Sequence, residues 1–210
     1  MPNIFIAGDS IVYGKWDPEG GWVSRFRNII DERYNLEDRK NILVYNLGVP
    51  GELVLQLADR LEPELNARIV SRGENILIIS AGLNDSCPNN QRTGEVTSPE
   101  KFMNAYRKCI EIGIQKGCRV LALGLTPVNP TRSKGKIFTE AGAAEYDGYV
   151  SEVCREMNVP KIELLEVLSG EHFTDGLVDS AHPGGDGHAR IAELVLAYAD
   201  REGILSDIVS

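Results

Sequence analysis

Five short runs of apolar residues recur along the chain, and each is followed by a longer segment with helical spacing of its apolar positions. The runs show no alternation with polar residues, so they predict strands buried on both faces, as in a parallel sheet. Strands that alternate with helices in this way predict βαβ units. The expected strands cover residues 4–7, 42–45, 76–80, 120–123 and 161–164.

The segments between these runs predict amphipathic helices. Leucines at four-residue spacing run through residues 52–72, where Pro63 predicts a break or a kink. The start of a further helix is indicated by Thr97-Ser98-Pro99-Glu100, which combines hydroxyl caps, a proline and an acid. The expected helices cover residues 22–35, 52–72, 99–117, 139–157 and 185–202.

Together these elements predict an α/β fold: a three-layer α/β/α sandwich around a five-stranded, mostly parallel sheet of the flavodoxin-like type. A chain of 210 residues is large enough for one substantial core, and no repeat or linker interrupts it. We therefore expect a single domain over residues 1–210.

Composition narrows the possible partners. The formal net charge of −9 argues against a general nucleic-acid binder, which would show a basic face. The four cysteines form no CxxC pair and show no metal-ligand spacing, and Cys109 and Cys154 are expected to be buried in helices. No signal peptide or membrane-spanning run is evident before or within the predicted elements, so we expect a cytoplasmic protein.

Polar and glycine-rich joints follow the first three predicted strands. They are Gly8-Asp9-Ser10, the segment 46–51 and the segment 81–85. Near the other end of the chain, Asp179-Ser180-Ala181-His182-Pro183 precedes the last helix. Because ligands bind beyond the carboxyl ends of parallel strands, these joints are expected to open onto one edge of the sheet. A serine at a strand end and an Asp-x-x-His pair are the parts of a hydrolytic triad.

Four ordered blocks of this sequence resemble those of the SGNH (GDSL) hydrolases. They are Gly8-Asp9-Ser10, Gly48, Gly82-Leu83-Asn84-Asp85 and Asp179-x-x-His182-Pro183. The resemblance extends from residue 4 to the final helix, and the order of the blocks is more specific than any one of them. It implies a serine hydrolase with this fold that needs no metal or organic cofactor.

The resemblance also implies a role for each matching residue. Ser10 would be the nucleophile, His182 the base and later the acid, and Asp179 the group that orients the imidazole. The oxyanion would be bound by the backbone N–H groups of Ser10 and Gly48 and by the side-chain amide of Asn84.

Several of these residues also have purely structural interpretations. Ser10 could cap the first helix, and Gly48 and Gly82 could serve only as turn residues. Asn84 could be a buried turn amide. We expect Asp9 to hydrogen-bond the local backbone of its turn rather than serve as the triad acid. Asp85 is expected to support the loop that carries Asn84.

The choice of base and acid also has alternatives. His172 has no supporting pattern, and His188 stands at the start of the last helix, where a structural role is expected. Asp175 is a rival to Asp179 but lies seven residues from His182. A metal site on His182 and His188 is a further alternative, although their spacing fits no common signature.

The function predicted first is a serine esterase or acyl hydrolase that cleaves a carboxylic ester or thioester through an acyl-enzyme. Its partner is then a small-molecule acyl ester, with no nucleic acid and no membrane span. Acyl transfer to an alcohol is the alternative with the same residues. A nucleotide-binding module lacks its phosphate loop here, and a phosphoacceptor domain using Asp9 lacks its acidic pair.

Two polar loops are expected to shape the pocket, although the sequence does not indicate the natural substrate or the oligomeric state. One covers residues 86–97 and follows the Asn84 block directly. The other covers residues 127–136 and carries Arg132, Lys134 and Lys136, a basic island in an acidic chain. It could meet a negatively charged substrate group or could be a solvated loop.

Overall fold

The structure, a computed structural model, describes residues 2–69, 74–90, 93–170 and 172–205. Its centre is a sheet of five strands in the order β2-β1-β3-β4-β5, and all four strand pairings are parallel. The strands are β1 (Asn3–Gly8), β2 (Leu43–Gly48), β3 (Asn75–Ser80), β4 (Cys118–Leu123) and β5 (Lys161–Ile162). The predicted α/β class with a parallel sheet is confirmed.

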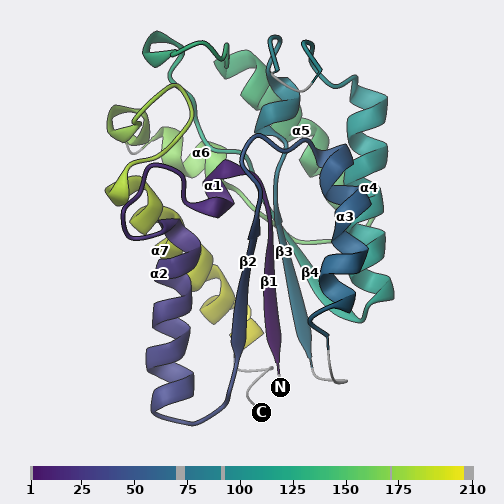
Figure 1. Ribbon diagram of the computed structural model, residues 1–210, viewed down its shortest axis with the longest axis vertical. Coiled ribbons are helices and arrows are strands. Elements are labelled where there is room, and N and C mark those ends of the chain that lie inside the picture. Colours follow the sequence, from purple (N-terminus) through teal and green to yellow (C-terminus); the bar gives the residue numbers. More distant parts are fainter. Residues whose placement is uncertain (1, 70–73, 91–92, 171, 206–210) are drawn as a thin grey trace.

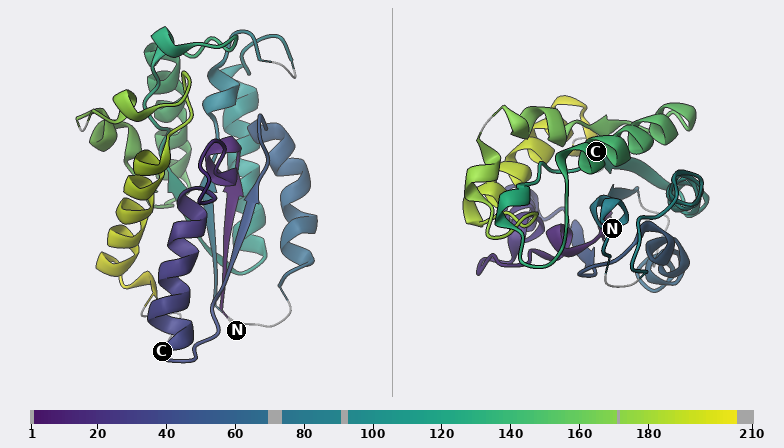
Figure 2. Two further views of the ribbon diagram at one scale, coloured as in Figure 1. Left: turned by 60° about the vertical axis from the view of Figure 1, so that its left-hand side comes forward. Right: turned by 90° about the horizontal axis from the view of Figure 1, so that it is seen from above.

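Helices cover both faces of the sheet (Figures 1 and 2). On one face α2 (Gly21–Ile30) packs against α7 (Gly185–Arg201). On the other face α3 (Val54–Asn66) packs against α4 (Pro99–Gln115), which also contacts α5 (Glu140–Glu156). Two short helices complete the set, α1 (Ser10–Tyr13) and α6 (Leu164–Ser169). The expected three-layer sandwich is therefore present.

Two of the boundaries that differ from the sequence prediction belong to α3 and β5. Of the break or kink expected at Pro63, the break is wrong, since α3 continues through this residue to Asn66. Pro63 lies in the last turn, where its missing N–H costs only one intrahelical hydrogen bond. Residues 70–72 of the expected helix lie outside the described residues. The fifth strand ends at Ile162, because Leu164 already begins α6.

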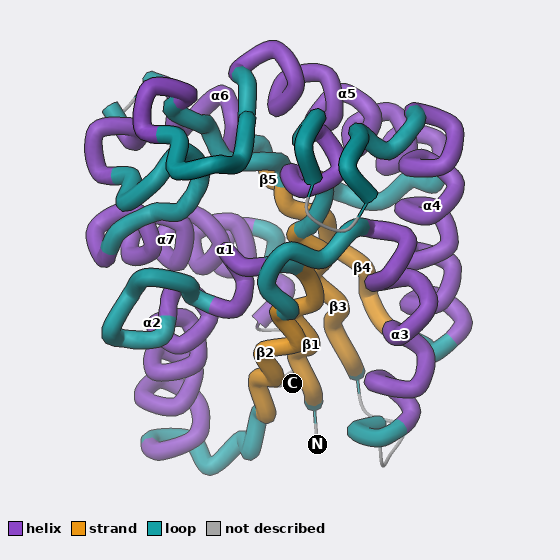
Figure 3. Tube along the Cα trace, turned by 45° about the horizontal axis from the view of Figure 1, so that its top comes forward, coloured by secondary structure: helices purple, strands orange, loops and turns teal. Residues whose placement is uncertain are grey.

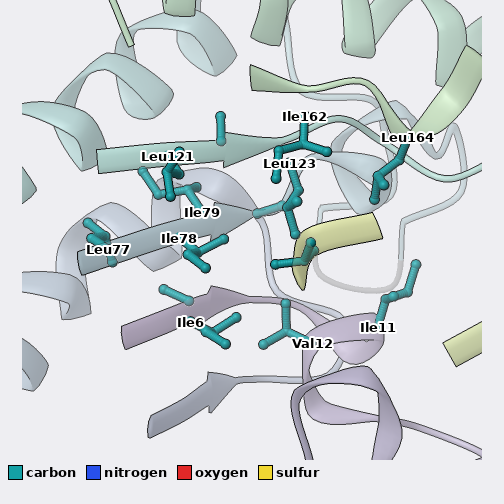
Figure 4. Packing of buried hydrophobic residues seen from close by; sticks show 14 of the residues in the cluster. Ile6, Ile11, Val12, Leu77, Ile78, Ile79, Leu121, Leu123, Ile162 and Leu164 are labelled. Atoms are coloured by element: carbon teal, nitrogen blue, oxygen red, sulfur yellow. The ribbon is translucent and has the colours of Figure 1, made fainter. Parts of the chain in front are cut away.

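The inner strands β1 and β3 are buried because helices lie against both sides of them. All six residues of β1 are buried, and their apolar side chains belong to one hydrophobic cluster that spans the sheet and its helices. Figure 4 shows part of this packing, in which Ile6 of β1, Ile78 of β3 and Leu121 of β4 lie on successive strands. Cys109 of α4 and Cys154 of α5 are buried as expected.

The strand order places a crevice at the carboxyl end of β1. The chain passes from β1 to β2 on one side and then crosses to β3 on the other, so the order reverses at β1. In open parallel sheets ligands bind at such a reversal. Figure 3 shows loops gathered over this end of the strands. Within the described ranges, no helix has the length and apolar character needed to cross a membrane.

Candidate active site

Ser10 lies in the tight turn between β1 and α1. The preceding residue Asp9 caps α1, since its Oδ1 accepts the backbone N–H of Ile11 at 2.9 Å. Asp9 is therefore the turn residue that the sequence predicts. The short helix ends at Gly14, whose φ of +87° is a left-handed conformation suited to glycine. The turn thus presents the Ser10 hydroxyl at the carboxyl end of β1.

His182 lies in the loop before α7 and meets Ser10 directly. Its Nε2 is 2.8 Å from Ser10 Oγ, although the two residues are 172 positions apart in the chain. Its Nδ1 is 2.7 Å from Oδ2 and 2.8 Å from Oδ1 of Asp179. The imidazole therefore bridges a hydroxyl and a carboxylate, which is the geometry in which a histidine can take the proton of a serine.

The Asp179 carboxylate also organises its own loop. Its Oδ1 accepts the backbone N–H groups of Ala181 and His182, each at 3.0 Å. Its Oδ2 accepts a hydrogen bond of 3.2 Å from the indole Nε1 of Trp16. Burial alone would raise the pKa of Asp179, but the hydrogen bonds from the His182 ring and the two backbone N–H groups hold it well below its usual range. This carboxylate is thus ionised beside the imidazole.

The other histidines lie in different environments. His188 is fully buried in α7, where its Nδ1 accepts the backbone N–H of Trp22 at 3.3 Å. Burial lowers the pKa of His188 to about 4, so it is neutral near pH 7. His172 is exposed and lies 3.7 Å from Asp175, the rival acid. Across the part of the chain that the structure describes, no group of histidine, cysteine and acidic side chains could hold a metal ion.

Gly48, which the sequence predicts as an oxyanion donor, lies at the end of β2. Its backbone N–H already donates to Oδ1 of Asn46 at 2.9 Å, while the Asn46 amide donates to the carbonyl of Val12 at 2.8 Å. A Cβ on Gly48 would lie 2.3 Å from the backbone nitrogen of Tyr13. Glycine is therefore needed at this position for the close approach of β2 to α1.

Gly51 is the glycine of this segment that reaches the cavity beside Ser10. It lines that cavity and has a φ of +76°. The expected segment 46–51 contains both glycines, so the sequence signal was present but did not distinguish between them. Which of the two glycines lines the cavity depends on the path of the loop after β2.

Asn84 lies in the turn after β3 and is buried beside the residues that line the cavity. Its Nδ2 donates to Oδ2 of Asp9 at 3.3 Å and to the carbonyl of Glu52 at 3.2 Å. Its Oδ1 accepts a hydrogen bond of 3.0 Å from Nζ of Lys136. The acceptor end of the amide, rather than the donor end, is thus bonded to Lys136, a side chain that lines the cavity.

The turns that carry Ser10 and Asn84 contain two buried carboxyl groups, those of Asp9 and Asp85. Burial raises the pKa of Asp9 to about 6 and that of Asp85 to about 7. Asp85 accepts a hydrogen bond of 2.7 Å from the hydroxyl of Thr97 and one of 3.1 Å from the N–H of Val54. It therefore connects the Asn84 turn to the starts of α3 and α4, the supporting role that the sequence predicts.

Ser10, His182 and Asp179 line a cavity of about 270 Å³. On this measure a single water needs about 10–15 Å³, so a small organic molecule can enter. Its walls include Ser10, His182, Asp179, Gly51 and Trp16. Trp16 is not among the residues predicted from the sequence, because no periodic pattern or motif around it indicates its hydrogen bond to Asp179.

Comparisons with known proteins agree with this architecture. The lipase/acylhydrolase of Enterococcus faecalis is 22% identical, with a TM-score of 0.77 and coverage of 96% of this chain and 97% of that chain. A lipolytic G-D-S-L family protein of Veillonella parvula is 21% identical, with a TM-score of 0.71 and coverage of 96% and 100%. An acetylxylan esterase of Geobacillus stearothermophilus is 17% identical, with a TM-score of 0.74 and coverage of 93% and 92%.

A comparison with curated proteins found no match. The model of the GDSL-like lipase/acylhydrolase family matches residues 6–190, which include every block quoted above. With this match and with the fold of its structural relatives, the chain belongs to the GDSL-like lipase/acylhydrolase family of ester-bond hydrolases.

Proposed function

We propose that the protein hydrolyses a carboxylic ester through a Ser10–His182–Asp179 triad and an acyl-enzyme. The single observation that carries this proposal is the continuous chain of short contacts from Ser10 Oγ through the imidazole to the Asp179 carboxylate. A serine hydroxyl is a weak nucleophile until a base removes its proton, and here the base is already in hydrogen-bond contact.

The reaction has two steps, acylation of Ser10 and hydrolysis of the acyl-enzyme. Ser10 Oγ forms a bond to the ester carbonyl carbon while its proton passes to His182 Nε2. The bond from this carbon to the alcohol oxygen then breaks, and His182 returns the proton to the leaving alcohol. Water next repeats these steps on the acyl-enzyme and releases the acid. Asp179 holds the imidazole in the required tautomer and stabilises the imidazolium.

The tetrahedral intermediates need hydrogen-bond donors for the oxyanion. We propose the backbone N–H of Ser10, the backbone at Gly51 in place of Gly48, and the amide of Asn84. Gly51 is favoured because it lines the cavity with Ser10, whereas the N–H of Gly48 is bonded to Asn46. The Asn84 nitrogen donates to Asp9 and to the carbonyl of Glu52, and one of these hydrogen bonds must be exchanged for the bond to the oxyanion.

The decisive experiment compares Ser10→Ala with the unmodified protein. With para-nitrophenyl acetate as substrate, Ser10→Ala should lower kcat by at least roughly 10³-fold, because the nucleophile is lost while the fold remains. A fluorophosphonate probe should label Ser10, as shown by intact mass and peptide mapping. This labelling also distinguishes the hydrolase from a module that only binds a ligand.

The matched control is Ser24→Ala. The Ser24 hydroxyl donates to the carbonyl of Gly20 within α2 and lies outside the cavity. This variant should keep both ester hydrolysis and phosphonate labelling. Activity that survives Ser10→Ala, or a probe attached to another residue, would contradict the proposed mechanism.

A further inference from the structure

Three lysines stand in the wall of the cavity that contains the triad. Lys15 follows α1, while Lys134 and Lys136 belong to the loop before α5. The chain has 22 basic and 31 acidic residues and is therefore negatively charged overall, whereas this cavity is lined by three ammonium groups. The acid that lines the same cavity is Asp179, and it is bonded to His182.

None of the three ammonium groups has a carboxylate partner within the described part of the chain. Among the ion pairs of the described residues, none includes Lys15, Lys134 or Lys136. Other lysines of this protein are paired; for example, Lys108 contacts Asp59 at 3.1 Å and Lys161 contacts Asp147 at 2.8 Å. The lysines of the cavity are therefore available to an anion that enters it.

Neutral contacts place two of these lysines close to the triad. Lys136 Nζ donates to Asn84 Oδ1 at 3.0 Å and lies 5.8 Å from the ring centre of Phe138. Lys15 Nζ lies 4.9 Å from the ring centre of Trp16, the residue whose indole contacts Asp179. Aromatic faces and an amide oxygen hold an ammonium group in place without neutralising its charge.

The loop that carries Lys134 and Lys136 is fixed on both sides. The Asn89 side chain donates to the carbonyl of Gly135 at 2.5 Å and accepts the N–H of Ile137 at 2.8 Å. Arg132 donates to the carbonyl of Asp175 at 3.0 Å, so this loop is also bonded to the segment that precedes Asp179. Arg132 itself serves as this anchor and does not line the cavity. The positions of the lysines thus follow from bonds to the surrounding loops.

Lys136 is half-buried, and this has an electrostatic consequence. Burial lowers the pKa of Lys136, and the nearby charge of Lys15 acts in the same direction, whereas the Asp9 and Asp179 carboxylates oppose it. A desolvated ammonium group without an ionic partner is stabilised by an anion placed beside it. The cavity is therefore complementary to a negatively charged group.

We propose that this cavity selects anionic esters, in which a carboxylate or phosphate group of the substrate lies against Lys15, Lys134 and Lys136 while the ester carbonyl meets Ser10. The inference rests on the proposed esterase function and assigns its substrate class. The three lysines bind and orient the substrate and take no part in the proton transfers.

The test measures kcat/KM for matched pairs of esters that differ in one negative charge or phosphate group. The acyl-side pair is mono-para-nitrophenyl succinate and para-nitrophenyl pentanoate. The alcohol-side pairs are para-acetoxybenzoate with its methyl ester, and para-acetoxyphenyl phosphate with para-acetoxyanisole. At least one anionic ester should be preferred over its neutral partner by about 10-fold or more, because a hydrogen bond to a charged group contributes about this factor. The preferred pair also distinguishes carboxylate from phosphate.

Variants then connect this preference to the lysines. Lys15→Gln and Lys134→Gln should each reduce the ratio of anionic to neutral kcat/KM, and the double variant should reduce it by about 10-fold or more. Neither residue contacts Asn84, so the ratio reports on charge rather than on the oxyanion site. Lys108→Gln, a change on the surface of α4, is the matched control and should leave the ratio unchanged.

The two proposals fail in different ways. Hydrolysis that depends on Ser10 but shows no preference for the anion in any pair would overturn the anionic substrate class and leave the esterase standing. A preference that persists in the double variant would also overturn the role of the lysines. No hydrolysis of any ester, together with no phosphonate labelling of Ser10, would overturn the esterase and the substrate class together.

Discussion

Asp179 is the residue on which the geometry of the proposed triad depends most. Its carboxylate accepts hydrogen bonds from the His182 ring, from two backbone N–H groups and from Trp16. The same side chain thus shapes the loop and orients the imidazole. The Asp-x-x-His spacing makes both roles possible, because the carboxylate reaches the N–H of the residue three positions later.

We predict that Asp179→Asn lowers kcat by about 10⁴-fold while the protein remains folded. The amide can keep an acceptor for the backbone N–H groups, but it cannot stabilise an imidazolium and it favours the wrong tautomer of His182. Steady-state hydrolysis of para-nitrophenyl acetate measures the change. Asp175→Asn is the control, since Asp175 is exposed and contacts His172 rather than His182. A rate within tenfold of the unmodified protein would contradict the assignment of the triad acid.

Asp85 is fully buried, and burial raises its pKa from 3.8 to about 7 in the folded protein. Between about pH 4 and pH 7 the folded state therefore holds a proton that the unfolded state has released. The unfolded state binds fewer protons in this window, so the free energy of unfolding falls as pH rises through it. Asp9, with a pKa raised to about 6, acts in the same direction over a narrower window.

We expect this effect of Asp85 to amount to about 1–3 kcal/mol between pH 5 and pH 7.5. Urea unfolding at the two pH values measures it. Asp85→Asn removes the titrating group, so the variant should lose less stability over the same interval, whatever its absolute stability. An equal pH dependence in both proteins would show that Asp85 does not titrate in this window.

At the scale of elements, packing decided where helices and strands end. Pro63 predicts a break, yet α3 continues because its buried face keeps contact with the core through Leu61 and Leu65. The last expected strand is reduced to two residues at the edge of the sheet. Periodicity located these elements well, but tertiary contacts determined their limits.

Replacement of Pro63 tests this interpretation. Pro63→Ala should raise the free energy of unfolding by about 1–2 kcal/mol, because it restores an N–H to the last turn, although it also increases the entropy of the unfolded chain. Thermal and urea unfolding measure the effect. Pro99→Ala is the matched control, since Pro99 occupies the first turn of α4, where proline is tolerated, and this change should give no gain. Destabilisation by Pro63→Ala would show that the proline is favourable in α3.

At the scale of the whole molecule, the sheet order concentrates stability in its centre. The strands β1 and β3 are paired on both sides and covered by helices on both faces, whereas β5 is a short edge strand. The base of the proposed site, at Ser10 and Asn84, follows directly from these two central strands. The residues completing it, Asp179 and His182, lie on a loop that reaches them from the other end of the chain.

Native-state hydrogen exchange should show this difference. We expect the slowest amides in β1 and β3, where exchange requires global unfolding, and faster exchange in β5, where local opening suffices. Mass spectrometry of peptides from these strands measures the rates under native conditions. Equal protection of β5 and β1 would mean that the edge of the sheet is as stable as its centre.

The sequence by itself determined the alternation of strands and helices, and with it the parallel sheet and the edge at which its joints meet. It also indicated Ser10, Asp179 and His182, because a nucleophile at a strand end and an acid three residues before a histidine are local patterns. Asp9 and Asp85 were assigned supporting roles on similar local grounds. These inferences could be drawn from the sequence because period, turn chemistry and short-range spacing are properties of neighbouring residues.

Only the tertiary structure decided which glycine of the segment 46–51 reaches the cavity, how the Asn84 amide is turned, and that lysines from separate segments line one wall. Each depends on contacts between residues far apart in the chain, such as Asn46 with Val12 and Lys136 with Asn84. Loop conformation follows from these long-range hydrogen bonds rather than from periodicity or local propensity. For that physical reason the sequence could indicate the proposed chemistry and a basic loop, whereas only the structure shows that Lys134 and Lys136 of this loop line the cavity together with Lys15.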